Sequence, residues 1–296
     1  MRCTKCRRPA IIFQRYSGLH LCREHFLAGF EAKAKRTVRV HGWIAPGDTV
    51  AIAVSGGKGS AALLSFLHAL LSRRGDVTLA AVTVDEGIAS CRGPGIARGI
   101  ARDLGVPCLT VSFNEHFGTT LDEIVRAKGE TLACSYCGVL RRHLLDAATK
   151  ELGATRLALG SSADDGAQSV LVGVMRGDCA GLLRGARPAG LVPRITPFMH
   201  IPEREVALYA FLRVRGFSLD RCPYSRNSLR EDVRRLLSGY AWRHPNAPFA
   251  LVNLGDSLSG PGNNYGEETA CCRWCGEPGG AICRSCRILA EVGHAP

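Results

Sequence analysis

Paired cysteines at both ends and in the middle of this chain constrain its fold more than any other feature. Near the N-terminus, Cys3-x2-Cys6 is followed after 15 residues by Cys22-x2-His25. Thiolate and imidazole ligands in two close pairs are typical of a tetrahedral zinc site. We therefore expect an N-terminal zinc finger held by these four residues, with two unrelated thiol pairs as the alternative.

A second set of pairs lies near the C-terminus. Cys272-x2-Cys275 is followed by seven residues, three of them glycine, and then by Cys283-x2-Cys286. This spacing predicts a compact four-cysteine zinc ribbon. Cys271 adjoins the first pair, but it does not give the x2 spacing and is interpreted as a bystander.

The middle of the chain contains three further cysteines, Cys134-x2-Cys137 and the distant Cys222. Three thiolates without an obvious fourth ligand suit an iron–sulfur cluster that keeps one iron open. A redox Cys-x-x-Cys pair, with Cys222 as a core thiol, is the alternative. The remaining single cysteines are interpreted as small buried apolar residues: Cys91, Cys108 and Cys179.

Composition narrows the class of partner and the compartment. The 296 residues include 38 Lys and Arg against 26 Asp and Glu, a formal charge of +12 that favours nucleic acid as a partner. With 46% hydrophobic residues the chain can bury a sizeable core. No stretch approaches the roughly 18 uncharged apolar residues of a membrane span, and the first residues lack an apolar signal core. We expect a cytoplasmic protein without a membrane partner, in which thiols bind metal rather than form disulfides.

A glycine-rich turn follows the first predicted strand of the central region. Residues 49–54 form a β-rich run, residues 55–60 read Ser-Gly-Gly-Lys-Gly-Ser, and residues 61–71 repeat leucine at helical spacing. Backbone N–H groups at such a strand–turn–helix junction can bind phosphate. The spacings of the classical P-loop and of the dinucleotide fingerprint are not matched. A plain tight turn is the alternative.

Further strands and helices alternate along the chain, which predicts a parallel α/β sheet. The expected strands are 77–84, 108–112 and 156–159, and the expected helices are 95–104, a segment from Cys134 to Leu152, 202–214 and 228–237. Asp164 and Asp165 follow the strand at 156–159, where ligands bind in open α/β sheets. Capping of the next helix by these carboxylates is the alternative.

These boundaries divide the chain into four parts. We expect an N-terminal zinc finger at 1–30, a nucleotide-binding catalytic domain at 31–250, a Gly-, Ser- and Asn-rich linker at 251–267 and a C-terminal zinc ribbon at 268–296. A basic loop with Arg184, Arg187 and Arg194 is expected after residue 178.

Taken in order, these motifs resemble those of the TtuA/Ncs-type tRNA 2-thiouridine synthetases, a family within the PP-loop ATP pyrophosphatase superfamily. The matching segments are the N-terminal finger, Ser-Gly-Gly-Lys-x-Ser, Val-Asp-Glu-Gly-Ile, Cys-Ser-Tyr-Cys-Gly-x-x-Arg-Arg, a Gly-to-Asp-Asp-x-x-Gln segment, Cys-Pro-Tyr-Ser and the terminal ribbon. The resemblance implies an adenine-nucleotide α-hydrolase-like (PP-loop) domain flanked by two zinc fingers. It also implies a [4Fe-4S] cluster on Cys134, Cys137 and Cys222.

The resemblance further implies a two-step reaction. The C2 oxygen of a tRNA uridine attacks the α-phosphorus of ATP, and sulfur then attacks C2 and expels AMP. It assigns ATP, Mg²⁺, two Zn²⁺ ions and the cluster as cofactors, and tRNA and a ubiquitin-like sulfur-carrier protein as partners; a homodimer stays open. Catalytic roles fall on Lys58, Arg141, Asp164 and Asp165. Nucleotide binding falls on Ala53, Ser55, Gly56, Gly57, Gly59, Ser60, Val84, Asp85, Gly160 and Asp165.

Two positions depart from the family pattern. Gly59 stands where the family normally has Asp, and residues 160–166 read Gly-Ser-Ser-Ala-Asp-Asp-Gly where it has Gly-His-Asn-x-Asp-Asp-Glu. Two other functions therefore stay open: a non-catalytic, zinc-ribbon tRNA-binding paralogue, and another PP-loop ATP-dependent ligase or amidotransferase. The modified uridine, at tRNA position 34 or 54, and the sulfur donor are also left open.

Overall fold

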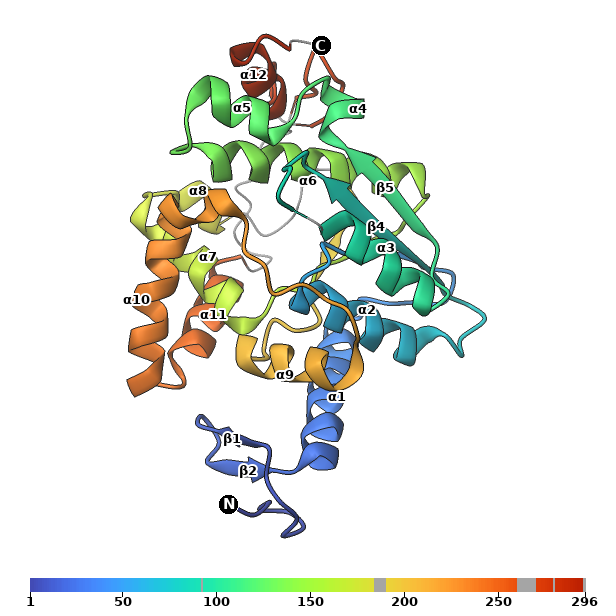
Figure 1. The fold of residues 1–296 in the computed structure, drawn as a ribbon, viewed down its shortest axis with the longest axis vertical. Coiled ribbons are helices and arrows are strands. Elements are labelled where there is room, and N and C mark those ends of the chain that lie inside the picture. The colour runs from blue at the N-terminus through green and yellow to red at the C-terminus, as the bar shows by residue number, and fades with distance from the viewer. Residues whose placement is uncertain (92, 184–189, 260–269, 279, 295–296) are drawn as a thin grey trace.

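The computed structural model describes residues 1–91, 93–183, 190–259, 270–278 and 280–294 (Figure 1). Its centre is a five-stranded parallel sheet in the order β5-β4-β3-β6-β7. The strands are β3 (Thr49–Ala53), β4 (Thr78–Asp85), β5 (Cys108–Ser112), β6 (Arg156–Ala158) and β7 (Arg194–Ile195). The predicted parallel α/β sheet is confirmed, and β7 is an additional edge strand that the sequence reading placed in a loop.

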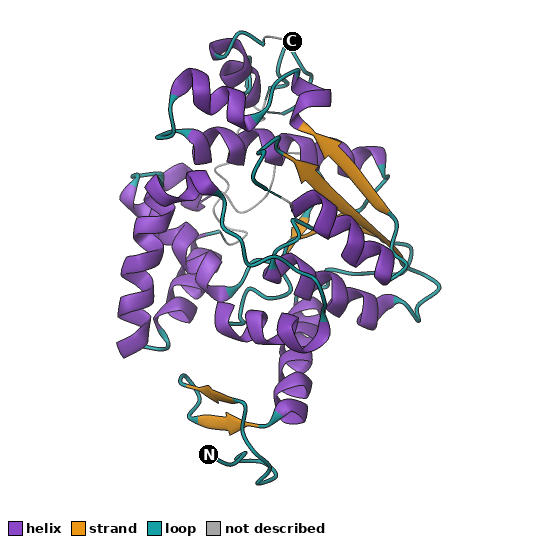
Figure 2. Cartoon of the chain, viewed as in Figure 1, coloured by secondary structure: helices purple, strands orange, loops and turns teal. Residues whose placement is uncertain are grey.

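Helices flank this sheet and extend beyond it (Figure 2). In chain order they are α1 (Arg23–Val40), α2 (Lys58–Leu71), α3 (Gly93–Asp103), α4 (Phe113–Phe117), α5 (Leu121–Lys128), α6 (Ala133–Glu151), α7 (Ala163–Met175), α8 (Cys179–Leu183), α9 (Glu203–Arg213), the 3-10 helix η1 (Pro223–Asn227), α10 (Leu229–Arg243), α11 (Ala247–Leu258) and α12 (Arg284–Glu291). None of the helices in the described ranges is long and apolar enough to cross a bilayer.

The alternation of side chains along β3 explains why helices cover both faces of the sheet. Val50 and Ile52 belong to the apolar cluster that includes residues of α2 and α9. Ala51, between them, belongs to the opposite cluster with residues of α5, α6 and α12. Because successive side chains of a strand point to opposite faces, one apolar strand supplies both halves of the core.

The N-terminal finger is joined to the domain by a continuous helix. Strands β1 (Ile12–Gln14) and β2 (Leu19–Leu21) pair antiparallel, and α1 then leads towards the sheet (Figure 1). Phe30 of α1 stacks on Tyr209 of α9 with ring centroids 4.1 Å apart. The predicted domain boundary at residue 30 therefore falls inside a helix that packs on the central domain.

Other expectations need correction. Residues 251–258 belong to α11 and not to a linker, and α11 packs on α7. The rest of that expected linker, apart from Ser259, lies outside the described residues, as do Arg184 and Arg187. Cys91 and Cys179 are exposed, so the interpretation of these two as buried residues was wrong, whereas Cys108 is partly buried and packs against the apolar core.

Candidate active site and metal centres

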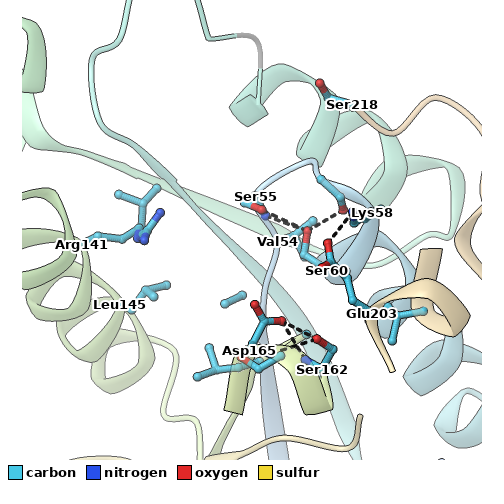
Figure 3. Close-up of a pocket in the computed structure, with 18 of the residues that line it drawn as sticks. Val54, Ser55, Lys58, Ser60, Arg141, Leu145, Ser162, Asp165, Glu203 and Ser218 are labelled. Carbon is cyan, nitrogen blue, oxygen red and sulfur yellow. Dashed lines mark hydrogen bonds and ion pairs between the residues drawn. The ribbon is translucent and has the colours of Figure 1, made fainter. Parts of the chain in front are cut away.

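A cavity of about 670 Å³ lies at the carboxyl ends of the central strands (Figure 3). Strand β3 pairs with β4 on one side and with β6 on the other, so the direction of strand succession reverses there. Ligands bind at such a switch point in open α/β sheets. The walls come from the β3–α2 loop, the end of β4, α6, the start of α7, α9 and residues 218–221.

The β3–α2 loop has the geometry of a phosphate cradle. The Ser55 N–H donates to Ser60 Oγ at 3.1 Å, and Ser60 Oγ donates to the Gly57 carbonyl at 3.0 Å. Gly56 has φ +78°, and a Cβ there would lie 2.5 Å from the Gly93 carbonyl oxygen, so only glycine fits. The loop leads directly into α2, whose first N–H groups carry the positive end of the helix dipole.

Lys58, the first residue of α2, faces an acid from a distant part of the chain. Its Nζ lies 2.6 Å from Glu203 Oε1 at the start of α9, and both side chains are about one-third exposed, at 37% and 33%. Figure 3 shows this pair at the wall beside Ser60. The sequence analysis did not identify Glu203, because nothing in the local pattern indicates that α9 begins beside the glycine-rich loop.

Two glycines allow the loop and the end of β6 to approach at backbone distance. A Cβ on Gly59 would lie 2.8 Å from the Gly160 carbonyl oxygen, and a Cβ on Gly160 would lie 2.5 Å from that of Gly59. Neither position has room for a side chain without movement of the backbone. The glycine that replaces the family's Asp is therefore part of a close contact.

Helix α6 forms a second wall of the cavity and contributes the guanidinium group of Arg141. The Arg141 Nη1 lies 3.3 Å from Glu86 Oε1, just beyond the end of β4. Arg141 and Leu145 lie one turn apart and both line the cavity, across from Lys58 in Figure 3. Apolar side chains of the neighbouring strands, including Val84, make a surface on which an adenine ring could pack.

The two predicted carboxylates at the start of α7 differ in position. Asp165 lines the cavity and forms a capping box with Ser162, accepting its N–H at 2.9 Å and its Oγ–H at 2.8 Å. Asp164 accepts the Glu203 N–H at 2.6 Å, and burial raises the pKa of its carboxyl group. Asp164 thus positions the helix that carries Glu203 and does not line the cavity itself.

Most of the predicted nucleotide-site residues come together around this cavity. Those that line it are Ala53, Ser55, Gly57, Lys58, Gly59, Ser60, Val84, Arg141, Gly160 and Asp165, whereas Gly56, Asp85 and Asp164 do not. Asp85 instead accepts the Gly87 N–H at 2.9 Å. The charged lining residues that the sequence analysis did not assign to the site are Glu86, Arg142, Arg194, Glu203, Asp220, Arg221, Arg230 and Arg234. Their positions depend on tertiary contacts between remote segments.

The two terminal ligand sets have the spacing of tetrahedral metal sites. In the finger, Cys6 Sγ and Cys22 Sγ are 3.6 Å apart, and His25 Nδ1 lies 3.5 Å from Cys3 Sγ and 3.4 Å from Cys22 Sγ. In the ribbon, Cys275 Sγ and Cys283 Sγ are 3.7 Å apart. A tetrahedral zinc ion with Zn–S bonds of about 2.3 Å places two sulfurs about 3.8 Å apart. Cys272 and Cys286 complete the ligand set of the ribbon. Each of the two predicted sets therefore fits one zinc ion.

One thiol in each terminal set is prepared for metal binding. Burial raises the pKa of Cys3, but backbone N–H groups near it and the His25 ring outweigh burial and lower the pKa to about 6. The pKa of Cys272 is lowered to about 6 in the same way, mainly by the backbone of Cys283 and Cys275. Thiolate is the form that binds metal.

Cys134, Cys137 and Cys222 lie together in a more open arrangement. Cys134 and Cys137 are on the first turns of α6, and Cys222 directly precedes η1. The Cys134 thiol contacts the carbonyl of Tyr224 at 3.4 Å, which brings the two segments together. Their sulfurs are not gathered within 4.8 Å of one another, as those of the terminal sets are. Burial, opposed by Arg141, raises the pKa of Cys137 to about 12.

This wider spacing distinguishes the kinds of metal centre that the three cysteines fit. Thiolates that bind one ion must lie close together, whereas thiolates on different irons of a cluster lie farther apart. Arg141, one turn after Cys137, also lines the main cavity, so the cysteines lie beside the nucleotide site. The donor set and spacing fit a three-thiolate cluster better than a zinc ion.

Comparisons with known proteins match this architecture. Residues 2–27 match the family described as 2-thiouridine synthetase TtuA, N-terminal LIM domain, and residues 29–238 match the PP-loop domain family. The tRNA 2-thiolation protein NcsA of Haloferax volcanii is 33% identical, over 99% of both chains. Cytoplasmic tRNA 2-thiolation protein 1 of Danio rerio is 32% identical, over 99% of this chain and 89% of its own.

A solved structure gives the same result in three dimensions. The U34-tRNA thiolase NcsA from Methanococcus maripaludis, determined with its [4Fe-4S] cluster, superposes with a TM-score of 0.85 at 31% sequence identity. The match covers 98% of this chain and 96% of that one. The chain therefore belongs to the family of PP-loop tRNA 2-thiolation proteins that includes NcsA and cytoplasmic tRNA 2-thiolation protein 1.

Proposed function

We propose that this protein is an ATP-dependent tRNA-uridine 2-sulfurtransferase. The observation that carries the proposal is the position of Cys134, Cys137 and Cys222 beside a cavity whose other wall is a phosphate-binding loop. A phosphate cradle alone would suit any PP-loop ligase. Three convergent thiols next to it supply what a sulfur transfer needs and what an amidotransferase or a simple RNA-binding protein does not.

ATP would bind across the cavity. The backbone of residues 55–60 and the Lys58 ammonium would hold the β- and γ-phosphates, while the adenine packs on the apolar strand ends. Phosphate would replace the Glu203 carboxylate as the partner of Lys58. A Mg²⁺ ion, which prefers carboxylate and phosphate oxygens, would be shared between the nucleotide and Asp165.

The first step forms a bond between the uridine C2 oxygen and the α-phosphorus and releases pyrophosphate. Negative charge develops on the phosphate oxygens, and Lys58 and Arg141, on opposite walls, are placed to stabilise it. The second step exchanges AMP for sulfur at C2. Asp164 contributes by fixing the start of α9, which keeps Glu203 against Lys58 in the absence of nucleotide.

A [4Fe-4S] cluster on Cys134, Cys137 and Cys222 would supply an iron with an open coordination position at which a sulfur donor can bind. Arg141 favours the thiolate form of Cys137 electrostatically, although burial opposes it. The same guanidinium would therefore serve both the cluster ligand and the nucleotide.

The charge distribution supports tRNA as the substrate. Residues 1–40 contain ten Lys or Arg and two Glu, a net +8 of the +12 of the whole chain. The sequence analysis predicts tRNA binding spread over both fingers and the arginine-bearing helices, on the basis of a charge distributed along the chain, and the concentration in residues 1–40 corrects that distribution. We infer that the finger and α1 provide the main electrostatic attraction for tRNA, with the arginines of α10 closer to the cavity.

The remaining assignments complete the proposal. Two zinc ions would hold the finger and the ribbon, and the central domain would lie between them, with α1 and α11 as its first and last helices. A ubiquitin-like thiocarboxylate protein would deliver sulfur, the protein would act in the cytoplasm, and a homodimer is compatible with the fold. Uridine 34 is the proposed position, on the basis of the whole-chain similarity to the Methanococcus enzyme.

Anaerobic assay of the reconstituted protein tests this function. The protein is incubated with ATP, sulfide and unmodified tRNA, and nucleosides are then analysed by mass spectrometry, with fragment mapping to locate 2-thiouridine. We expect ATP-dependent 2-thiouridine at position 34 and release of pyrophosphate. Binding of tRNA without pyrophosphate release would identify a non-catalytic paralogue, and pyrophosphate release without thiolation would identify another PP-loop ligase.

A further inference from the structure

A second cavity, of about 350 Å³, lies between α6, residues 191–194 and the C-terminal ribbon. Four arginines line it: Arg142 from α6, Arg194 from β7, and Arg284 and Arg287 from α12. Arg142 and Arg194 also line the main cavity, so the two cavities adjoin at these side chains. The cation-rich walls thus come from three elements that are far apart in the sequence.

The acids in this second cavity are already engaged. Asp146 pairs with Arg194 at 3.1 Å, and Glu277 pairs with Lys150 at 2.7 Å. Among the described residues, Arg142, Arg284 and Arg287 form no ion pair. Burial and the neighbouring Arg194, Arg284 and Arg141 lower the pKa of Arg142. Three guanidinium groups without a carboxylate partner of their own indicate that an external anion compensates them.

The ribbon is held firmly enough to place its arginines. Ile288 and Leu289 of α12 belong to the apolar cluster of α6, and the Tyr136 hydroxyl donates to Glu291 at 3.4 Å. The Lys150–Glu277 pair adds a contact on the other side of the ribbon. The arginines of α12 are therefore presented to Arg142 by a packed interface.

We propose that this second cavity binds a phosphate of the RNA backbone next to the uridine that enters the main cavity. The proposal rests on the proposed function, because it takes RNA as the polyanion. Guanidinium groups match phosphate oxygens in bidentate geometry. A phosphate flanks each nucleotide of a strand, so a uridine in the main cavity carries one towards the shared wall at Arg142. The phosphates of ATP would be held elsewhere, by the β3–α2 loop with Ser55, Lys58 and Ser60, which lies across the main cavity from Arg141 (Figure 3).

The double variant Arg284→Gln/Arg287→Gln tests the proposal in the full-length, metal-loaded protein. The matched control is Arg273→Gln, which removes a charge from an exposed residue of the same ribbon outside the cavity. Affinity for tRNA is measured by fluorescence anisotropy at several salt concentrations. ATP and inorganic pyrophosphate affinities are measured in parallel, and zinc content verifies the ribbon.

We expect the double variant to weaken tRNA binding about tenfold, as for loss of a charged contact. The log–log salt slope should fall by about one, and the loss should be equal for substrate and non-substrate tRNAs, because a phosphate carries no sequence information. ATP and pyrophosphate affinities should not change. Unchanged tRNA affinity, or an equal loss in Arg273→Gln, would overturn the inference and leave the proposed function intact.

Two other outcomes would also overturn it. Weaker ATP or pyrophosphate binding with normal tRNA binding would assign the cavity to a free phosphate of the nucleotide. Failure of the wild-type protein to bind tRNA would refute this inference and the proposed function together.

Discussion

The terminal metal sites and the central cysteines differ in how closely their ligand atoms lie and in what surrounds them. At the ends, the ligand atoms of each set lie within 4.8 Å of one another, and one thiol in each set has a pKa near 6, whereas the pKa values of Cys6, Cys275 and Cys286 are raised. In the centre, the sulfurs are farther apart and the pKa of Cys137 is about 12. The terminal sites are closed and suited to structural metal, whereas the central cysteines adjoin a cavity and, within the described ranges, do not form a compact four-ligand set. The arrangement of the cysteines, more than their number, distinguishes the structural metal sites from the candidate catalytic site.

Removal of one cysteine from each kind of site should give the largest contrast. Cys137→Ala should abolish 2-thiouridine formation and the visible absorbance of a cluster, while two zinc ions per chain remain. Cys275→Ala should lose one zinc and lower the melting temperature, because metal binding and folding of a small ribbon are coupled. Metal analysis, absorbance and mass spectrometry check both variants. Zinc loss in Cys137→Ala with unchanged absorbance would reverse the assignment.

Nucleotide activation should depend on the opposite wall of the cavity. Lys58→Ala should reduce tRNA-dependent pyrophosphate release by about 10²- to 10³-fold, because it removes a cation at the reacting phosphate. Metal content and tRNA affinity should be unchanged. Arg74→Ala, which breaks a surface ion pair with Asp76 just before β4, is the control and should retain activity. If Lys58→Ala lost tRNA affinity but released pyrophosphate normally, the loop would belong to the RNA site.

The backbone contact between Gly59 and Gly160 should be more sensitive than ordinary glycines. Gly59→Ala should destabilise the protein by about 1–3 kcal/mol, the usual range for overpacking, because its Cβ would meet the Gly160 carbonyl. Gly59→Asp should behave similarly and should not restore activity. Gly99→Ala, in α3 with open space around it, is the control and should be neutral or slightly stabilising. Thermal unfolding measures the stability of all three variants, and tRNA-dependent pyrophosphate release measures the activity of Gly59→Asp. A Gly59→Asp variant that is stable and more active than the wild type would indicate that the natural site has lost catalytic function.

The raised pKa of Cys137 predicts a smaller effect, a dependence of metal loading on pH. A thiol with a pKa near 12 keeps its proton at neutral pH and must release it to bind iron, so loading of the centre should accelerate from pH 6.5 to 8.5. Cys3, with a pKa near 6, is largely ionised over that range, but the raised pKa values of Cys6 in the finger and of Cys275 and Cys286 in the ribbon should make zinc loading accelerate with pH as well. Reconstitution followed by absorbance, beside zinc uptake, measures both. A rate of cluster loading that does not change between pH 6.5 and 8.5 would contradict the assigned protonation of Cys137.

Sequence reasoning succeeded where local pattern determines structure. The ligand pairs are defined by their spacing, and β3 with its glycine-rich turn is defined by an apolar run followed by small residues. It failed where remote segments meet. Glu203 lies next to Lys58 only because α9 packs on α2, and Arg194 occupies β7 because an edge strand completes the sheet. Residues 251–258 include Leu and Val at four of eight positions and form the end of α11, with Val252 buried against the helices around α7, so the Gly-, Ser- and Asn-rich linker was placed too early in the sequence.

The central claim is that the three central cysteines serve catalysis and that the two terminal metal sites serve only the structure. It is tested most directly by measuring 2-thiouridine formation while iron is selectively removed and restored anaerobically, with zinc held at two ions per chain. The account predicts that activity falls with the iron content and returns on reconstitution, while the melting temperature of the ribbon and finger stays constant. Full activity in iron-free, zinc-loaded protein would contradict it.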